Sequence, residues 1–297
     1  MTTEPLLSIL TPAYNEEPFL EAMVRSLQRQ TDDRWELVLV DDGSTDGTAD
    51  LAERLATEDS RIRVAGARTK LRKVPAFNLA FSASRGTHIC HVGADDLVPP
   101  HSVEERLASL PEPGERASFG KFTTMDPEGR GTSGPLPRGA NGSRSAAGLT
   151  MTRGMAERLF PIPEHLVAED VWLGEGAGLL DIDPTHVQAV IYQYRLHPGN
   201  SNPRHRPFPE MNEKMFARSR AVEAILEQDR FPVPPGTREQ LELRWKVAQL
   251  RHQGDIRGIL AENRMPLVDR LANVAMAHPV LWRLRQQFSG VLTGWRG

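Results

Sequence analysis

The stretch Val38-Leu39-Val40-Asp41-Asp42-Gly43-Ser44-Thr45-Asp46-Gly47-Thr48 decides the fold. It closes an apolar run that begins at Trp35, adds two acids and a glycine turn, and then opens an amphipathic pattern with helical spacing. Side chains just past the carboxyl end of a parallel strand project into the crevice where ligands bind, and a helix that starts there offers unpaired N–H groups. The stretch therefore predicts an α/β protein with a ligand-binding edge after this strand.

The first hundred residues repeat this alternation of strand and helix. Apolar runs predict strands at residues 6–10, 35–40, 61–65 and 88–92. Between these runs, apolar residues recur at helical spacing within residues 19–27, 51–56 and 76–83. This rhythm is typical of βαβ units, so we expect a Rossmann-like, mostly parallel sheet flanked by helices.

The pattern changes after residue 111. Glycine, proline and serine dominate residues 111–148, apart from a candidate strand at 118–125, and we interpret residues 127–148 as a flexible flap. Helices are expected at 151–159 and 169–180, and a strand at 187–194. Beyond Pro209 the pattern is helical nearly to the end. We therefore divide the chain into a catalytic domain, residues 1–203, and a helical C-terminal extension, residues 204–297.

Composition limits the class of protein. The only cysteine among the 297 residues, Cys90, lies in an apolar run, and no stretch resembles a signal peptide or a membrane span. We therefore expect a soluble, cytoplasmic protein. Residues 1–203 hold 20 Lys and Arg against 29 Asp and Glu, whereas residues 204–297 hold 16 against 10.

The basic C-terminal segment admits several partners. Its cations alternate with acids and form no stripe with aromatic residues, so we expect no nucleic-acid partner. Apolar residues between 267 and 295 form an amphipathic pattern. This pattern fits a peripheral membrane contact, self-association with a second copy, or packing against the catalytic domain itself.

An ordered set of motifs accompanies the opening stretch. It consists of Thr11-Pro12-Ala13-Tyr14-Asn15-Glu16-Glu17, Gly93-Ala94-Asp95-Asp96, Glu169-Asp170 and Tyr194-Arg195-Leu196-His197. In this order the motifs resemble those of the family 2 inverting glycosyltransferases, which have the GT-A fold. The resemblance covers residues 6–203 and implies transfer of a sugar from a nucleotide-diphosphate sugar to an acceptor hydroxyl.

The resemblance assigns a nucleotide side to the site. Pro12, Ala13 and Tyr14 follow the first strand and would lie against the base and ribose. Glu16 and Asp42 would accept hydrogen bonds from the ribose or from a base N–H, which fits uridine but also guanine and thymine. For Glu16 the alternative is a residue that merely helps to start the following helix.

The resemblance also places a metal and the diphosphate. Ala94 and Asp95 would lie beside the donor, and Asp95 would hold Mg²⁺ or Mn²⁺ with help from His197, whereas Gly93 stands where the family has the first acid of an Asp-x-Asp motif. Basic side chains before the helix at Pro75, with Asn78 one turn later, would bind phosphate or sugar; the cations we single out are Lys70 and Arg72. A solvated basic loop is the alternative for each cation.

The catalytic base is assigned through Glu169-Asp170-Val171-Trp172-Leu173. Inverting transfer is a single displacement, so one carboxylate must take the proton of the acceptor hydroxyl. The resemblance gives this role to Asp170, and Glu169 would orient the acceptor or the base. Trp172 fits either stacking on a sugar or packing in the core.

Two other functions are compatible with parts of this sequence. A nucleotidyltransferase would need a glycine-rich basic loop after the first strand, where this chain has an acidic segment without glycine. A catalytically degenerate nucleotide-sugar-binding or scaffold protein is the stronger alternative, because Gly93 removes one expected carboxylate. The sequence predicts neither the sugar nor the acceptor, since pocket shape decides both.

Overall fold

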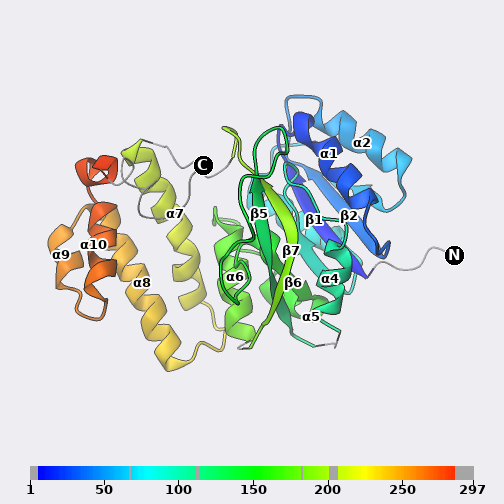
Figure 1. The fold of residues 1–297 in the computed structure, drawn as a ribbon. Coiled ribbons are helices and arrows are strands. Elements are labelled where there is room, and N and C mark those ends of the chain that lie inside the picture. Colours follow the sequence, from blue (N-terminus) through cyan, green and yellow to red (C-terminus); the bar gives the residue numbers. More distant parts are fainter. Residues whose placement is uncertain (1–5, 67, 112–113, 182, 201–206, 285–297) are drawn as a thin grey trace. The chain divides into compact units, whose positions relative to one another are not determined.

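The computed structural model describes residues 6–66, 68–111, 114–181, 183–200 and 207–284 (Figure 1). Contacts within the chain separate two compact units, Met1–His197 and Pro198–Gly297. The boundary that we expected, between residues 203 and 204, lies outside the described residues.

The first unit is built on one sheet of seven strands in the order β3-β2-β1-β4-β6-β5-β7. Strands β3, β2, β1 and β4 are parallel, β6 is antiparallel to β4 and β5, and β7 is parallel to β5. The mostly parallel α/β sheet predicted from the sequence is therefore confirmed. The strands are β1 Leu7–Ala13, β2 Trp35–Asp41, β3 Ile62–Val64, β4 His88–His91, β5 Ala117–Met125, β6 Leu149–Thr152 and β7 Thr185–Arg195.

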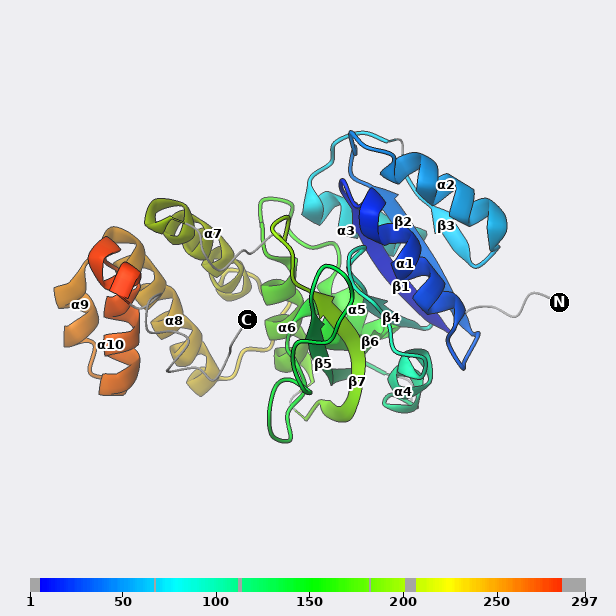
Figure 2. The same ribbon diagram turned by 45° about the horizontal axis from the view of Figure 1, so that its top comes forward.

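Helices cover both faces of this sheet (Figure 2). Leu7 and Ile9 of β1 belong to a buried cluster that also contains apolar residues of α1 and α2. Because successive strand residues point to opposite faces, Leu10 points away from this cluster, and α3 packs on β1 and β2 there. The helices are α1 Glu17–Gln28, α2 Thr48–Glu58, α3 Lys73–Ala83, α4 Ser102–Ala108, α5 Arg153–Leu159 and α6 Glu169–Leu180, with a 3₁₀ turn η1 at Ala146–Gly148.

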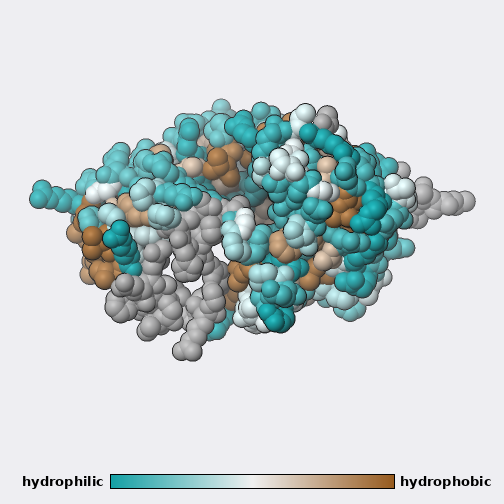
Figure 3. Space-filling view, turned by 90° about the horizontal axis from the view of Figure 1, so that it is seen from above, coloured by the Kyte–Doolittle hydropathy of each residue, from teal (hydrophilic) through white to brown (hydrophobic). Residues whose placement is uncertain are grey.

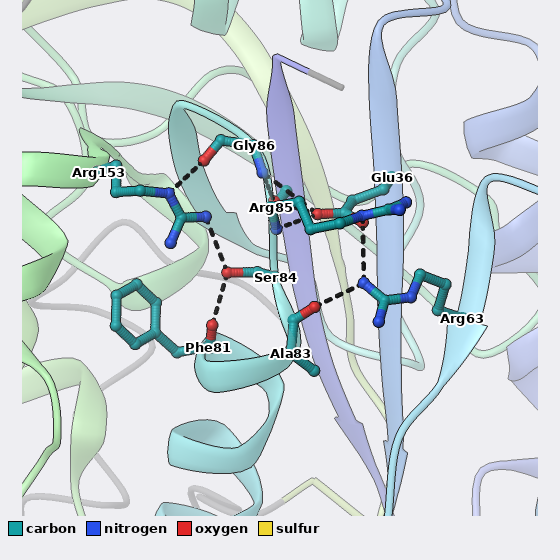
Figure 4. Close-up of polar contacts among 9 residues, drawn as sticks. Glu36, Arg63, Phe81, Ala83, Ser84, Arg85, Gly86 and Arg153 are labelled. Atoms are coloured by element: carbon teal, nitrogen blue, oxygen red, sulfur yellow. Dashed lines mark hydrogen bonds and ion pairs between the residues drawn. The ribbon is translucent and has the colours of Figure 1, made fainter. Parts of the chain in front are cut away.

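A buried carboxylate anchors the connection from α3 to β4 (Figure 4). Glu36 of β2 accepts hydrogen bonds from Ser8 Oγ at 2.7 Å and from the backbone N–H of Arg85. Burial alone would raise the pKa of Glu36, but these hydrogen bonds hold it below its ordinary value. Arg153 of α5 donates to the carbonyl of Gly86 at 2.7 Å. The C-terminal end of α3 is thus fixed between the central strands and α5.

The structure differs from the sequence prediction after residue 148. We expected a helix over residues 151–159, but β6 occupies Leu149–Thr152 and the helix starts at Arg153. Thr152 ends the strand and caps the helix, because its hydroxyl accepts from the backbone N–H of Met155 at 3.4 Å. The flap at residues 127–148 has no regular element before η1 and pairs with β5 through the bridges Phe122–Leu136 and Met125–Gly131.

All regular secondary structure described in the second unit is helical, as expected. It comprises α7 Phe208–Leu226, α8 Pro235–Gln253, α9 Ile256–Ala261 and α10 Leu267–Ala275. Apolar side chains, brown in Figure 3, gather on the surface over α9 and α10; Leu267, Val268 and Leu271 are all more than half exposed. Residues 285–295 of the expected amphipathic segment lie outside the described residues. Within the described ranges, no helix is both long enough and apolar enough to cross a membrane.

Candidate active site

The candidate site lies at the carboxyl edge of β1, β2 and β4. These strands are neighbours in register, with Ala13 opposite Asp41 and Leu10 opposite His91. The segments that follow them therefore meet at one edge of the sheet, where open α/β sheets bind ligands. Pro12 is half-buried at this edge, and Ala13 and Ala94 are buried, so the last two contribute shape and backbone rather than exposed side chains.

The turn after β2 is held by its own acids. The carboxylate of Asp41 accepts from the backbone N–H groups of Gly43 and Ser44 at 3.2 Å. Asn15 Oδ1, in the segment after β1, accepts from the backbone N–H of Thr45 at 2.8 Å. Glu16 precedes α1 but makes no side-chain capping bond, so its carboxyl does not serve to start that helix. The two loops therefore brace each other and leave Glu16 facing the site.

Glu16, Asp95 and His197 form a cluster that fits a cation. One ligand atom from each lies within 4.8 Å of the others, and His197 Nε2 is 3.0 Å from Asp95 Oδ2. Burial first, and then the charge of Asp95, raise the pKa of Glu16 to about 7. Within the described ranges Glu16 Oε2 is buried without a hydrogen-bond partner. From the sequence, Glu16 was expected to contact the nucleotide and was not grouped with Asp95 and His197.

Arg195 holds the end of β7 against the segment that follows β4. Its guanidinium donates to the carbonyls of Asp95 and Pro127 at 2.7 and 2.6 Å, and its backbone N–H donates to Asp96 Oδ1 at 3.0 Å. An antiparallel bridge between Leu97 and Gln193 continues this contact. In the sequence, Arg195 stands only within the motif Tyr194-Arg195-Leu196-His197. Its place two residues before His197, a predicted metal ligand, was the available signal.

Asp96 and Gly93, the two remaining positions of the acidic motif, are tightly packed. Asp96 is only 3% exposed and faces the backbone of Arg195. Its burial, and then the neighbouring Asp95, raise its pKa well above the ordinary value. A Cβ at Gly93 would lie 2.6 Å from Asp95 Oδ1 and 2.9 Å from Asp96 Oδ2. The position that lacks the family acid is therefore filled by the carboxylates of its neighbours.

A second constellation surrounds Asp42, which is buried at the end of β2. Asp42 Oδ1 accepts from the backbone N–H groups of Leu71 and Arg72, both at 2.7 Å. Lys70 Nζ lies 3.0 Å from Asp42 Oδ2 and 3.1 Å from the ring centre of Tyr14. The structure thus brings together the side chains of Tyr14, Asp42 and Lys70 and the backbone of Arg72, four of the predicted nucleotide residues.

Asn78 makes its hydrogen bonds to the backbone of Ile162, away from Asp42 and Lys70. Its Nδ2 donates to the carbonyl of Ile162 at 2.9 Å, and its Oδ1 accepts from the N–H of Ile162 at 2.8 Å. In this structure Asn78 joins α3 to the segment before α6. Its predicted contact with the donor stays a prediction.

The beginning of α6 carries Glu169 and Asp170. Glu169 is 2% exposed, and its Oε1 lies 2.7 Å from Lys73 Nζ at the start of α3. Burial, the largest effect, raises the pKa of Glu169, and Lys73 opposes this effect. Trp172 is fully buried and its Nε1 donates to the carbonyl of Leu159 at 2.9 Å. Trp172 is therefore a core residue, and the alternative of sugar stacking is wrong for it.

A family model and curated relatives match the N-terminal half of the chain. Residues 8–151 match the family described as Glycosyl transferase family 2. Glycosyltransferase GlyG of Streptococcus pneumoniae is 30% identical over 121 residues, which are 41% of this chain and 40% of GlyG. The chain spans half or less of the length of the first curated relatives that it matches.

Solved structures share the fold across nearly the whole chain. S. aureus TarS 1–349 in complex with UDP-GlcNAc has a TM-score of 0.63 at 19% identity, over 92% of this chain and 82% of the TarS chain. Mannosyltransferase PcManGT from Pyrobaculum calidifontis, in complex with GDP-Man and Mn²⁺, has a TM-score of 0.60 at 15% identity, over 97% of this chain and 88% of its own. The GT-A fold expected from the sequence is confirmed.

Proposed function

We propose that this chain, whose residues 8–151 match glycosyltransferase family 2, transfers a sugar from a nucleotide-diphosphate sugar to an acceptor hydroxyl with inversion. The observation that carries the proposal is the convergence of Glu16, Asp95 and His197 at the carboxyl edge of the sheet. Tyr14 and Asp42 lie at the same edge. A nucleotide-binding surface and a set of cation ligands at one edge are what such a donor requires.

The nucleotide is proposed to bind along Pro12, Ala13, Tyr14 and Asp42. Tyr14 is 45% exposed and offers a ring face, while the buried carboxylate of Asp42 offers an acceptor for a base N–H. UDP-GlcNAc binds the TarS neighbour and GDP-Man binds PcManGT, and both bases carry such an N–H. We propose a UDP-sugar as the donor.

A divalent cation fits the cluster of Glu16, Asp95 and His197. Two carboxylates suit Mg²⁺ or Mn²⁺, and the imidazole favours Mn²⁺, because Mg²⁺ prefers oxygen ligands. The buried Oε2 of Glu16, which has no hydrogen-bond partner within the described ranges, supports this reading. When bound, the cation neutralises charge that develops on the leaving diphosphate.

Asp170 is proposed as the base of a single displacement. The acceptor oxygen bonds to the anomeric carbon as the bond from that carbon to the phosphate oxygen breaks, and the hydroxyl proton passes to the Asp170 carboxylate. Glu169 lies beside it, held by Lys73 at the first turn of α3. This ion pair fixes the first turn of α6, so we propose that Glu169 and Lys73 orient the base.

A test separates this enzyme from a degenerate scaffold, the alternative raised by Gly93. Nucleotide release from a panel of UDP- and GDP-sugars is measured with Mn²⁺ for the native chain and for Asp170→Asn. Release by the native chain that falls at least about 100-fold in the variant supports the proposal. Binding of a nucleotide-sugar with no release, and no effect of the substitution, would identify a scaffold.

The exposed apolar residues of α10 support a contact outside the catalytic unit. Leu267 and Leu271 are one helical turn apart and both are exposed, which fits a peripheral membrane site or a second copy of the chain. Co-sedimentation with anionic vesicles and the molar mass in solution distinguish the two. The substitution Leu267→Gln together with Leu271→Gln should abolish whichever contact exists.

A further inference from the structure

Lys70 covers both groups that would recognise a nucleobase. Its ammonium lies 3.0 Å from Asp42 Oδ2 and 3.1 Å from the centre of the Tyr14 ring. The Lys70 side chain is 50% exposed, whereas the Asp42 side chain is 7% exposed. A half-exposed cation therefore lies on the second carboxylate oxygen of Asp42 and on the Tyr14 ring, both of which a base would use.

The backbone of this loop is fixed independently of the ammonium. Asp42 Oδ1 already holds the N–H groups of Leu71 and Arg72. Gly43 has a φ of 71°, and a Cβ there would lie only 2.6 Å from the backbone nitrogen of Lys70. Because a side chain at residue 43 would push this segment away, glycine permits the close approach. Asp42 Oδ1 thus accepts hydrogen bonds from the loop backbone, and Asp42 Oδ2 pairs with the Lys70 ammonium.

We infer that the Lys70 ammonium occupies the nucleobase position when no donor is bound and moves to the diphosphate when a donor binds. The inference rests on the proposed function, since it concerns the nucleotide side of the same site. An imide N–H that donates to Asp42 Oδ2 and a base that stacks on Tyr14 cannot coexist with the ammonium in its present place. The long stem of lysine lets the ammonium move while the backbone stays fixed.

This movement of the Lys70 ammonium makes the affinity for a nucleotide depend on its phosphates. A nucleoside displaces Lys70 from Asp42 and Tyr14 and offers no new anion. A nucleoside diphosphate displaces it too, but provides phosphate oxygens that accept charge-assisted hydrogen bonds from the ammonium. Lys70 therefore acts as a specificity determinant that penalises uridine and favours UDP.

Calorimetric titration with uridine and with UDP, in Mn²⁺, tests the inference. Lys70→Met keeps much of the apolar stem and removes the charge. We expect it to bind uridine about three- to tenfold more tightly and UDP about three- to tenfold more weakly, from the size of exposed cation–π and ion-pair contacts. Lys70→Arg should restore preference for UDP. If Lys70 had a purely structural role, its substitution would weaken the binding of both uridine and UDP.

Arg68→Met is the matched control. Arg68 lies on the same loop, but its guanidinium pairs with Asp50 at 2.7 Å instead of Asp42. Its loss removes the same charge and should leave uridine binding unchanged. Guanosine and GDP are titrated in parallel to cover a guanine donor.

The outcomes separate this inference from the proposed function. If Lys70→Met binds uridine no more tightly than the native chain, or retains full UDP affinity, the inference is wrong while the donor site stands. If the native chain binds neither UDP nor GDP, the proposed function is wrong and the inference falls with it.

Discussion

The substitution Glu16→Gln should change how stability depends on pH. Burial and the charge of Asp95 raise the pKa of Glu16 from 4.5 to about 7. A carboxyl whose pKa is raised on folding stabilises the folded state below pH 4.5, and that contribution is lost as the pH rises through 7. Ionising Glu16 in the folded protein therefore opposes folding above neutral pH.

The magnitude follows from the shift. A change in pKa from 4.5 to about 7 sets an upper bound of about 3 kcal/mol of folding free energy, and solvent screening of the half-buried carboxyl lowers the actual contribution. Glutamine keeps a similar shape but cannot ionise, so the variant escapes this loss. Relative to the native chain, Glu16→Gln should gain up to about 3 kcal/mol between pH 4.5 and pH 8.

Urea denaturation in chelator at several pH values from 4.5 to 8 measures this difference. The free energies of unfolding of the two proteins should diverge as the pH rises. Added Mn²⁺ should reverse the order at pH 8, because only the native chain offers Glu16 as a ligand. Parallel pH profiles for the two proteins would refute the placement of Glu16 in a buried, acidic cluster.

Three further substitutions test other parts of the account. Asp170→Asn should lower turnover at least about 100-fold while UDP affinity changes by less than about twofold, as kinetics and calorimetry would show; equal losses in both would contradict its role as base. Lys73→Met removes the partner of buried Glu169 and should cost about 1–2 kcal/mol, since Lys73 is half exposed. Its effect should be larger at pH 8 than at pH 4 in denaturation experiments, because Glu169 must ionise without its cation; a loss independent of pH would argue against the ion pair. Trp172→Ala should cost about 3–5 kcal/mol of stability, measured by urea denaturation, because Trp172 is fully buried; a change below about 1 kcal/mol would contradict its core position.

The sequence predicted the parallel half of the sheet because apolar periodicity is a local signal. The runs at β1, β2 and β4 are each followed within a few residues by an acid, namely Glu16, Asp42 and Asp95, so their shared edge could be inferred before any coordinates. β6 was missed because Leu149–Thr152 runs without a loop into the helix that begins at Arg153, and its pairing with β4 and β5 decides its conformation. Such pairing across distant segments leaves no periodic trace in so short a run.

The site was predicted only in part, because some of its contacts join segments that are distant in the sequence. Asp95 and His197 were grouped through motif order, and the structure places them 3.0 Å apart. Glu16 follows β1, the parallel neighbour of β4. His197 follows β7, whose end Arg195 fixes beside the segment after β4. This contact depends on tertiary structure, so spacing along the chain could not show it.

The most direct test of the central claim is the affinity for UDP, measured by calorimetry with Mn²⁺ and with chelator. The native chain should bind UDP at least about tenfold more tightly with Mn²⁺, and Asp95→Asn should lose this difference. UDP binding that is indifferent both to chelator and to Asp95→Asn would contradict a metal-assisted donor site at Glu16, Asp95 and His197.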